Sequence, residues 1–276
     1  MTTTLETMND AGAARAILAG RPRPARPGSL SIALAFGGRA LRKLRRTPVQ
    51  LFDVAVHPVV FTLMFTYLFG GAIGGSSGRY LGYLVPGILV MTLLVTTGTT
   101  GAALSLDIAS GVFDRFRTMS IRPAAVLVGA LLGDVVRYAL ASTVVVGLGL
   151  ALGFRPHGNA AAVVAAVLLV LAFSFSLSWV WTALAMVMKT PGAVLGVTQA
   201  VLYPLSFFSN IFVKTATLPG GLRAVVNVNP VTHLVTAVRG LMSGTADVGQ
   251  ITWILLACAV LTAVFAPLSL RLFRSR

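Results

Sequence analysis

The sequence predicts an all-α integral membrane protein with six transmembrane helices, and two observations carry this prediction. Of the 276 residues, 56% are hydrophobic and only 11% are charged, whereas soluble domains carry about 25% charged residues. The apolar residues also gather into six stretches, each close to the roughly 20 residues that cross the hydrocarbon core of a bilayer. The excess apolar content is therefore lipid-facing surface and not an enlarged core.

The N-terminal region is expected to stay outside the bilayer core. Residues 1–29 read as a disordered basic tail, because the repeated prolines of segment 21–27 block regular helical hydrogen bonding. Residues 30–46 read as an amphipathic interface helix that lies along the inner membrane surface. Its leucines share one face, and the opposite face carries Arg39, Arg42, Lys43 and Arg46. Residues 30–276 then form a single membrane domain.

The six spans follow in order, separated by turn-forming or charged segments. We place them at about 51–70, 80–105, 124–152, 160–187, 193–213 and 250–270. A helix of about 20 residues is roughly 30 Å long, which matches the hydrocarbon thickness. Pro123 stands just before the third span, at a position that suits a helix N-terminus.

Residues 214–249 do not fit this scheme. They are moderately apolar but are broken by Pro219-Gly220-Gly221 and by Asn229-Pro230. Neither half reaches the roughly 17 residues that a span needs. Two short helices that dip into the outer membrane edge and pack on protein suit this composition, and a plain surface loop is the alternative.

The basic residues fix the orientation. Nine Lys and Arg precede the first span, three lie between the second and third, and Lys189 and three terminal arginines complete a total of 16 on one side. The other side holds five: Arg79, Arg155, Lys214, Arg223 and Arg239. This bias places both termini in the cytoplasm of a multi-pass plasma-membrane protein. The net charge of +15 is thus explained by topology and anionic headgroups, and no nucleic-acid partner is expected.

Two charged residues fall inside the third span. Asp134 and Arg137 are three positions apart and so share a helix face. A charged side chain at this depth raises the free energy of the folded protein unless it is paired with an opposite charge or reached by water. A structural intramembrane ion pair is one interpretation; a gate, a cargo contact or a proton relay are the others.

The sequence predicts no catalytic, cofactor or metal site on this chain. A P-loop needs a lysine that follows glycine, and none of Lys43, Lys189 and Lys214 does. There is no HExxH motif and no cysteine pair. Aromatic residues of spans one, four and five, such as Phe61, Phe65 and Phe207, are expected to pack or to contact lipid, or to line a path for an amphiphilic cargo.

The segment between spans two and three carries both signs of charge and exposed aromatics. Residues 106–123 read as a helix with Val112, Phe116 and Met119 on one face, and Asp107, Gly111, Asp114 and Thr118 on another. Such a cytoplasmic segment suits insertion into a partner's groove, or it is a solvated connector.

Residues 106–123 resemble the cytoplasmic loop of ABC type-2 permeases: an acidic residue, a glycine four on, an acidic-Arg-aromatic-Arg run and a later Arg-Pro. Within that family the likeness is to the daunorubicin/doxorubicin-resistance permeases of actinobacteria. Further matching segments, in the same order from about residue 30 onward, are Arg46-Thr47-Pro48, Pro58, Leu218–Arg223, Asn229–Thr232 and Val238–Leu241.

The resemblance implies an assembly. It implies a coupling helix that docks on a separate ABC ATPase subunit, two copies per complex, through Asp107, Gly111, Asp114, Arg115, Phe116 and Arg117. ATP and Mg would bind to that partner and not to this chain. A second permease subunit, as homodimer or heterodimer, would complete the path between two halves. The re-entrant outer segment would include Pro219, Arg223, Asn229, Pro230 and Arg239.

The expected function is ATP-driven export of a hydrophobic or amphiphilic compound, such as an antibiotic or a complex lipid, across the bacterial plasma membrane. An ion-gradient-driven transporter or channel and a non-transport scaffold are alternatives from other classes. Within the favoured class the cargo could instead be a lipid-linked glycan, because apolar cavities discriminate poorly between such compounds.

Overall fold

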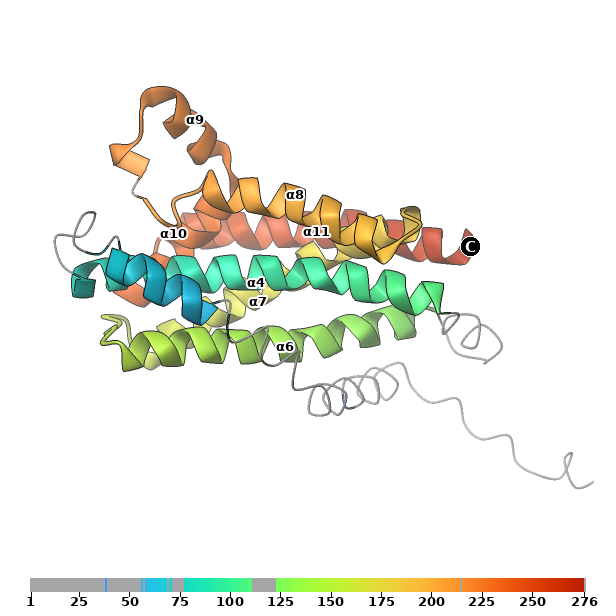
Figure 1. Ribbon diagram of the computed structural model, residues 1–276, viewed down its shortest axis with the longest axis horizontal. Coiled ribbons are helices and arrows are strands. Elements are labelled where there is room, and N and C mark those ends of the chain that lie inside the picture. Colours follow the sequence, from blue (N-terminus) through green and yellow to red (C-terminus); the bar gives the residue numbers. More distant parts are fainter. Residues whose placement is uncertain are drawn as a thin grey trace, which may run out of the picture.

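The protein is a bundle of long helices that lie side by side, with short helices at one end (Figure 1). The computed structural model describes residues 58–68, 77–110, 123–213 and 215–275, together with Gly38, Val56 and Gly70. The helices are α4 (Ser77–Ala109), α6 (Pro123–Ala151), α7 (Ala160–Val187), α8 (Pro191–Phe207), α9 (Gly220–Val228), α10 (Pro230–Ser243) and α11 (Val248–Ser275), with a 3-10 turn η1 (Thr215–Thr217). A further apolar helix covers Pro58–Leu68. No strand occurs among these residues, so the all-α prediction is confirmed.

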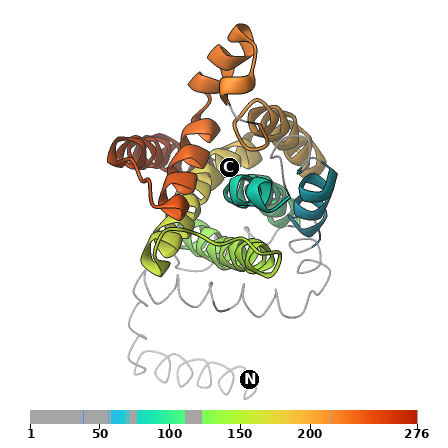
Figure 2. The same cartoon turned by 90° about the vertical axis from the view of Figure 1, so that its left-hand side faces the viewer.

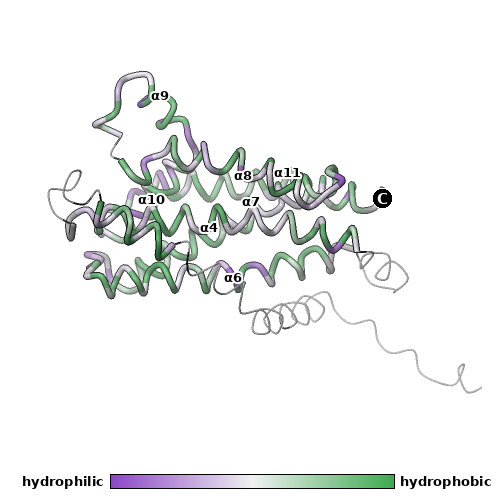
Figure 3. The backbone as a smooth tube through the Cα atoms, in the orientation of Figure 1, coloured by the Kyte–Doolittle hydropathy of each residue, from purple (hydrophilic) through white to green (hydrophobic). Residues whose placement is uncertain are grey.

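Four helices are long and apolar enough to cross a membrane: α4, α6, α7 and α11. They match the predicted second, third, fourth and sixth spans. In Figure 3 their colouring is largely apolar, with a hydrophilic stretch in the middle of α6. Of the predicted first span, 51–70, the structure describes Val56, Gly70 and the Pro58–Leu68 helix. The predicted tail 1–29 and the predicted interface helix 30–46 lie outside the described residues except for Gly38, which is helical and exposed.

The fifth predicted span was placed too far along the chain. Its helix, α8, ends at Phe207 and not near residue 213. Residues 208–213, which we call the α8 tail, leave the helix and pack into the end of the bundle, where Ser209, Asn210, Ile211 and Phe212 are buried. Asn229 at the start of α10 satisfies this helix end: its amide donates to the carbonyl oxygens of Leu205 and Phe208, at 2.7 and 2.6 Å, at the point where the helix stops.

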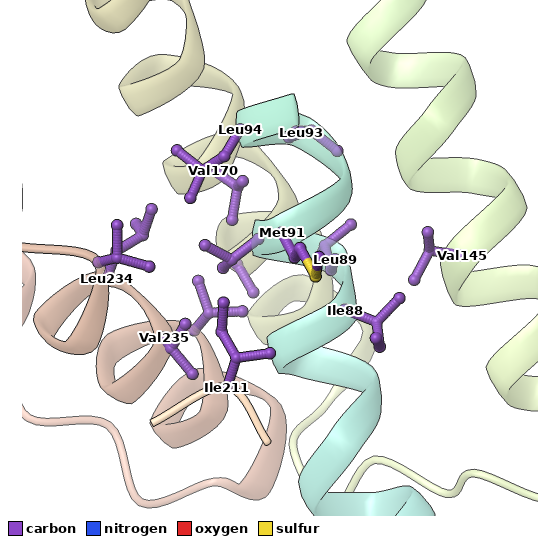
Figure 4. Packing of buried hydrophobic residues seen from close by; sticks show 14 of the residues in the cluster. Ile88, Leu89, Met91, Leu93, Leu94, Val145, Val170, Ile211, Leu234 and Val235 are labelled. Atoms are coloured by element: carbon purple, nitrogen blue, oxygen red, sulfur yellow. The ribbon is translucent and has the colours of Figure 1, made fainter. Parts of the chain in front are cut away.

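α4 is the central helix of the bundle. It contacts α6, α7, α8 and α10, and Figure 2 shows it enclosed by them. Its buried apolar side chains point in several directions: Figure 4 shows Ile88 toward Val145 of α6, and Ile211 and Val235 on the opposite side of the helix. α11 is the most exposed of the four long helices, as expected of a helix that faces lipid.

The helix ends carry ordinary capping signals. Asn159 and Thr190 accept backbone N–H groups at the starts of α7 and α8, from Ala162 and Ala193. Gly244 ends α10 with φ 75°, a left-handed conformation that glycine adopts without steric cost. Local sequence signals therefore define these three ends.

We call the end where α4, α7 and α11 begin and where α6 and α8 finish the outer end, because the charge bias predicts that it faces the outside of the cell. Of the segment predicted at 214–249, the structure describes residues 215–249, which lie there as η1, α9, α10 and the start of α11, so this part is helical and not a plain loop. α9 stands off the bundle (Figure 1) and contacts η1 and α10. α10 packs into the bundle against α7, α4 and α11.

Gly87 lets α4 approach the α8 tail closely. A Cβ at this position would lie 2.7 Å from the Ile211 carbonyl oxygen and 3.1 Å from its Cα, and backbone atoms cannot swing aside. We expect Gly87→Ala to lower the free energy of unfolding by about 1–3 kcal/mol, the usual cost of overpacking. The midpoint of thermal unfolding in detergent measures this change.

Gly82, on the exposed side of the same helix, supplies the control. A Cβ there meets nothing within 4 Å, so Gly82→Ala should leave the midpoint unchanged or raise it slightly, since alanine favours helix. Equal midpoints for the two variants would contradict the close approach.

Candidate functional site

A polar cluster lies inside the bundle between α4 and α6. Nη2 of Arg137 is 3.2 Å from Oδ1 of Asp134, so the two residues form an ion pair on one face of α6. The same nitrogen donates to the Thr96 carbonyl oxygen and to Oγ1 of Thr100 on α4, both at 3.1 Å. The cation thereby ties α6 to the threonine-rich middle of the central helix. Both charged side chains are largely buried, with 14% and 21% of their surface exposed.

Counting donors fixes the direction of the hydrogen bonds that continue from Thr100. Ser178 donates its single hydroxyl hydrogen to the Ser174 carbonyl oxygen at 2.7 Å, so it accepts from the Tyr138 hydroxyl 2.8 Å away. Tyr138 has then used its hydrogen, and Thr100 donates to it across 2.7 Å. Thr100 itself accepts from Arg137. The hydrogen bonds therefore all point the same way. They run from Arg137 of α6 to Thr100 of α4, back to Tyr138 of α6, and then through Ser178 to a backbone carbonyl of α7.

This series of hydrogen bonds holds the helices together, and it offers no route for a proton from Arg137 to the Ser174 carbonyl oxygen. An arginine side chain keeps its protons in proteins, and a backbone carbonyl has no proton to release. The central Tyr138 is fully buried. Trp181 of α7 adds a parallel tie, because its indole N–H donates to Oγ1 of Thr97 at 3.0 Å. Of the interpretations left open for Asp134 and Arg137, a proton relay through Tyr138 is thus not supported.

A second cluster lies at the outer end around the carbonyl oxygen of Asn210, in the α8 tail. The Tyr83 hydroxyl of α4 donates to it at 2.8 Å, and Nη2 of Arg239 on α10 donates to it at 3.2 Å. Arg239 also donates to the Tyr83 carbonyl oxygen at 3.1 Å, and its guanidinium lies 3.7 Å from the centre of the Tyr83 ring. α4, α10 and the α8 tail are therefore joined at one point.

Further bonds hold the α8 tail in place. The Tyr80 hydroxyl of α4 donates to the Phe212 carbonyl oxygen at 3.2 Å. The Asn210 amide donates to Oγ1 of Thr236 on α10 at 2.9 Å. The Phe212 ring stacks on Phe65 of the Pro58–Leu68 helix with 4.3 Å between ring centres, and on Phe207 at 5.5 Å.

The remaining residues predicted for the outer segment have structural positions. Pro219 and Pro230 precede or open α9 and α10, where their fixed φ suits a helix start. Arg223 donates to the carbonyl oxygens of Ala216 and Leu218, at 2.8 and 3.3 Å, and so stabilises the turn before α9. Asn229 caps α10 through Val231 N–H at 2.8 Å, in addition to its two bonds to the end of α8.

Most of the residues predicted for ATPase docking cannot be placed. Asp107 is half-buried in the last turn of α4. The other docking residues, Gly111, Asp114, Arg115, Phe116 and Arg117, and the interface-helix residues Arg39, Arg42, Lys43 and Arg46, lie outside the described residues. Their roles stay predictions.

Sequence reasoning missed Tyr83, Asn210, Thr100 and Tyr138. Their contacts to other helices join residues 26 to 156 positions apart, and no local pattern announces them. A signal that could have found part of the inner cluster is the serine-rich stretch of α7, because buried hydroxyls in a membrane helix need a partner. In the part of the chain that the structure describes, no three His, Cys, Asp or Glu side chains gather in a way that could hold a metal ion.

Comparisons with known proteins agree with this architecture. Residues 34–243 match the family described as ABC-2 type transporter. The chain is also 45% identical over 265 residues to the daunorubicin resistance ABC transporter permease protein DrrB1 of Streptomyces coeruleorubidus. That alignment covers 96% of this chain and 94% of the relative.

Proposed function

This chain belongs to the ABC-2 type transporter family, and on that premise we propose that it exports a hydrophobic or amphiphilic compound with energy supplied by a separate ATPase. The observation that supports this proposal most strongly is the 45% identity to a permease along nearly the whole chain. The membrane-subunit role itself agrees with a bundle whose long helices are apolar enough to span a bilayer.

The proposed source of energy is a pair of ABC ATPase subunits that bind ATP and Mg. They would dock on the cytoplasmic segment between α4 and α6, through Asp107, Gly111, Asp114, Arg115, Phe116 and Arg117. The division of labour is supported by the sequence, in which no lysine follows a glycine-rich turn. This chain would then supply the path and perform no covalent chemistry.

The proposed assembly pairs this chain with a second permease subunit, a second copy or a homologue. Six spans, with the Pro58–Leu68 helix and α8 as parts of the first and fifth, keep both termini in the cytoplasm of a multi-pass plasma-membrane protein. The 16-to-5 bias of basic residues supports this orientation.

For the cargo, an antibiotic-like amphiphile is the first candidate. The relative's name describes resistance to daunorubicin, and the apolar bundle with exposed aromatic side chains at its outer end, such as Tyr203, Phe207 and Phe208, suits such compounds. A complex lipid or a lipid-linked glycan is the other candidate within the same class.

Transport in inverted membrane vesicles tests the proposal. Vesicles that contain this chain with its ATPase should accumulate daunorubicin only when ATP is added, and collapse of the ion gradients should not stop the uptake. Uptake that follows an ion gradient and ignores ATP would favour a secondary transporter or channel. An absence of flux for every cargo class would favour a scaffold.

Docking through the segment between α4 and α6 gives a separate prediction. Asp114→Ala and Phe116→Ala should each abolish co-purification with the ATPase, or uncouple its ATP hydrolysis from transport, because a mixed-charge amphipathic segment loses a charge or an anchor. Pull-down and the ratio of cargo moved to ATP hydrolysed measure the two outcomes. Variants that bind and transport like the parent would show that docking occurs elsewhere.

A further inference from the structure

We propose that the outer gate of this permease is the contact between Phe65 and Phe212, and that it favours cargo with a flat aromatic surface. The inference rests on the proposed function and names the place where the path opens. It follows from the bonds that surround the α8 tail, residues 208–213, because these bonds differ in kind from one side to the other.

Toward α4, the α8 tail is tied by polar bonds and close backbone packing. The hydroxyls of Tyr80 and Tyr83 donate to the carbonyl oxygens of Phe212 and Asn210, at 3.2 and 2.8 Å. Gly87 packs directly on the backbone of Ile211, which is fully buried. Withdrawal of the tail from α4 would strand these polar groups, and buried unpaired groups are costly.

Toward α10, the tail is tied just as firmly. Arg239 donates to the Asn210 carbonyl oxygen at 3.2 Å, and the Asn210 amide donates to Thr236 at 2.9 Å. The Asn229 amide holds the Phe208 carbonyl oxygen at 2.6 Å. The tail, α4 and α10 are therefore expected to move as one unit.

Toward the Pro58–Leu68 helix, the described part of the chain shows a ring stack on the tail. Phe65 and Phe212 lie 4.3 Å apart between ring centres, with 19° between their planes. Phe61 continues the row at 5.9 Å from Phe65, and Phe207 at 5.5 Å from Phe212. Parting two rings strands no hydrogen-bonding group, so this seam opens more easily than the sides tied to α4 and α10.

The Pro58–Leu68 helix also carries two buried hydroxyl groups that would gain hydrogen-bond partners if the seam opened. Thr62 and Thr66, one turn apart, are 1% and 4% exposed, and within the described structure neither Oγ1 makes a hydrogen bond. Each threonine directly follows a phenylalanine of the row, Phe61 or Phe65, so separation of the rings would open a way for water or a cargo hydroxyl to reach them. The open seam would then offer parallel ring faces beside hydroxyls, which suits a planar aromatic compound with polar substituents.

Reversible cross-linking of the seam tests the gate. In a Cys258→Ala background, Phe65→Cys/Phe212→Cys would be bridged with a short bis-methanethiosulfonate reagent, in the full complex with its ATPase. Because this variant lacks both rings, uptake is followed with a radiolabelled alkyl-trimethylammonium. We expect its ATP-driven uptake to fall at least tenfold on bridging and to return after reduction, while the ATPase stays bound. The matched control is Ser176→Cys/Thr262→Cys, which joins α7 to α11 where the two hydroxyls lie 3.1 Å apart; its bridge should leave uptake at the parent level.

The outcomes separate the gate from the function. Uptake that persists with a bridged seam, or a reagent that fails to bridge the two cysteines, would overturn the gate. Parent complex that shows no ATP-driven uptake would instead overturn the proposed function. The cargo preference has its own test: Phe65→Leu should reduce daunorubicin uptake at least fivefold more than uptake of a radiolabelled alkyl-trimethylammonium, and equal losses would overturn it.

Discussion

Replacement of Arg137 by methionine is expected to destabilise the bundle by about 3 kcal/mol, the scale measured when one partner of a buried ion pair is removed. Methionine keeps the length of the side chain but cannot donate to Thr96 or Thr100, which lose bonds of 3.1 Å. Asp134 also loses its counter-charge at 3.2 Å. The midpoint of thermal unfolding in detergent, followed by tryptophan fluorescence, measures the loss.

A second substitution shows where the cost arises. Asp134→Asn removes the charge that methionine leaves uncompensated, so Asp134→Asn/Arg137→Met should recover at least about 1 kcal/mol relative to Arg137→Met alone. Arg137→Lys keeps the positive charge without the planar fork and should fall between parent and Arg137→Met. A parent-like Arg137→Met would show that the cluster does not tie α4 to α6.

Asn229→Ala is expected to lower stability by about 3 kcal/mol, because one amide serves two helix ends. About 1 kcal/mol comes from the lost N-cap of α10, where Oδ1 accepts from Val231 at 2.8 Å. About 1 kcal/mol more comes from each of the two α8 carbonyl oxygens left without a donor, which Asn229 now holds at 2.7 and 2.6 Å. The side chain is only 7% exposed, so water cannot easily replace it.

Asn229→Ser separates these contributions. Serine also accepts at an N-cap position but cannot reach both α8 carbonyl oxygens, so it should retain about 1 kcal/mol of what alanine loses. Hydrogen exchange in α8 should rise near Leu205 and Phe208 in both variants, since the end of that helix loses its restraint. Unchanged exchange there would contradict the dual capping role.

The two stabilising positions have different consequences for transport. Arg137 lies in the middle of the bundle, where it holds α4 and α6 together. Asn229 lies at the outer end, where it sets the place at which α8 stops and the α8 tail begins. Loss of Asn229 should therefore disturb the outer gate directly, whereas loss of Arg137 acts through the whole bundle.

Much of the fold follows from the sequence because the bilayer imposes a local rule. Apolar backbone in lipid must satisfy its hydrogen bonds within its own helix, so the length of an apolar run defines the helix. The fourth span, predicted at 160–187, is α7 at Ala160–Val187, and α6 begins at Pro123 and ends at Ala151 against a prediction of 124–152. The ion-pair partners Asp134 and Arg137 could also be named in advance, because they are three positions apart on one helix.

The tertiary structure alone decided how the helices turn toward one another. The spans are apolar on every side, so their sequences do not state which face meets which neighbour. The end of α8 depends on Asn229, more than 20 positions further on, and the outer cluster joins Tyr83 to Arg239 across 156 positions. The series of hydrogen bonds from Arg137 to Ser174 likewise forms only once three helices are packed together. Local hydrophobicity thus determined the helices, and long-range polar contacts decided their arrangement.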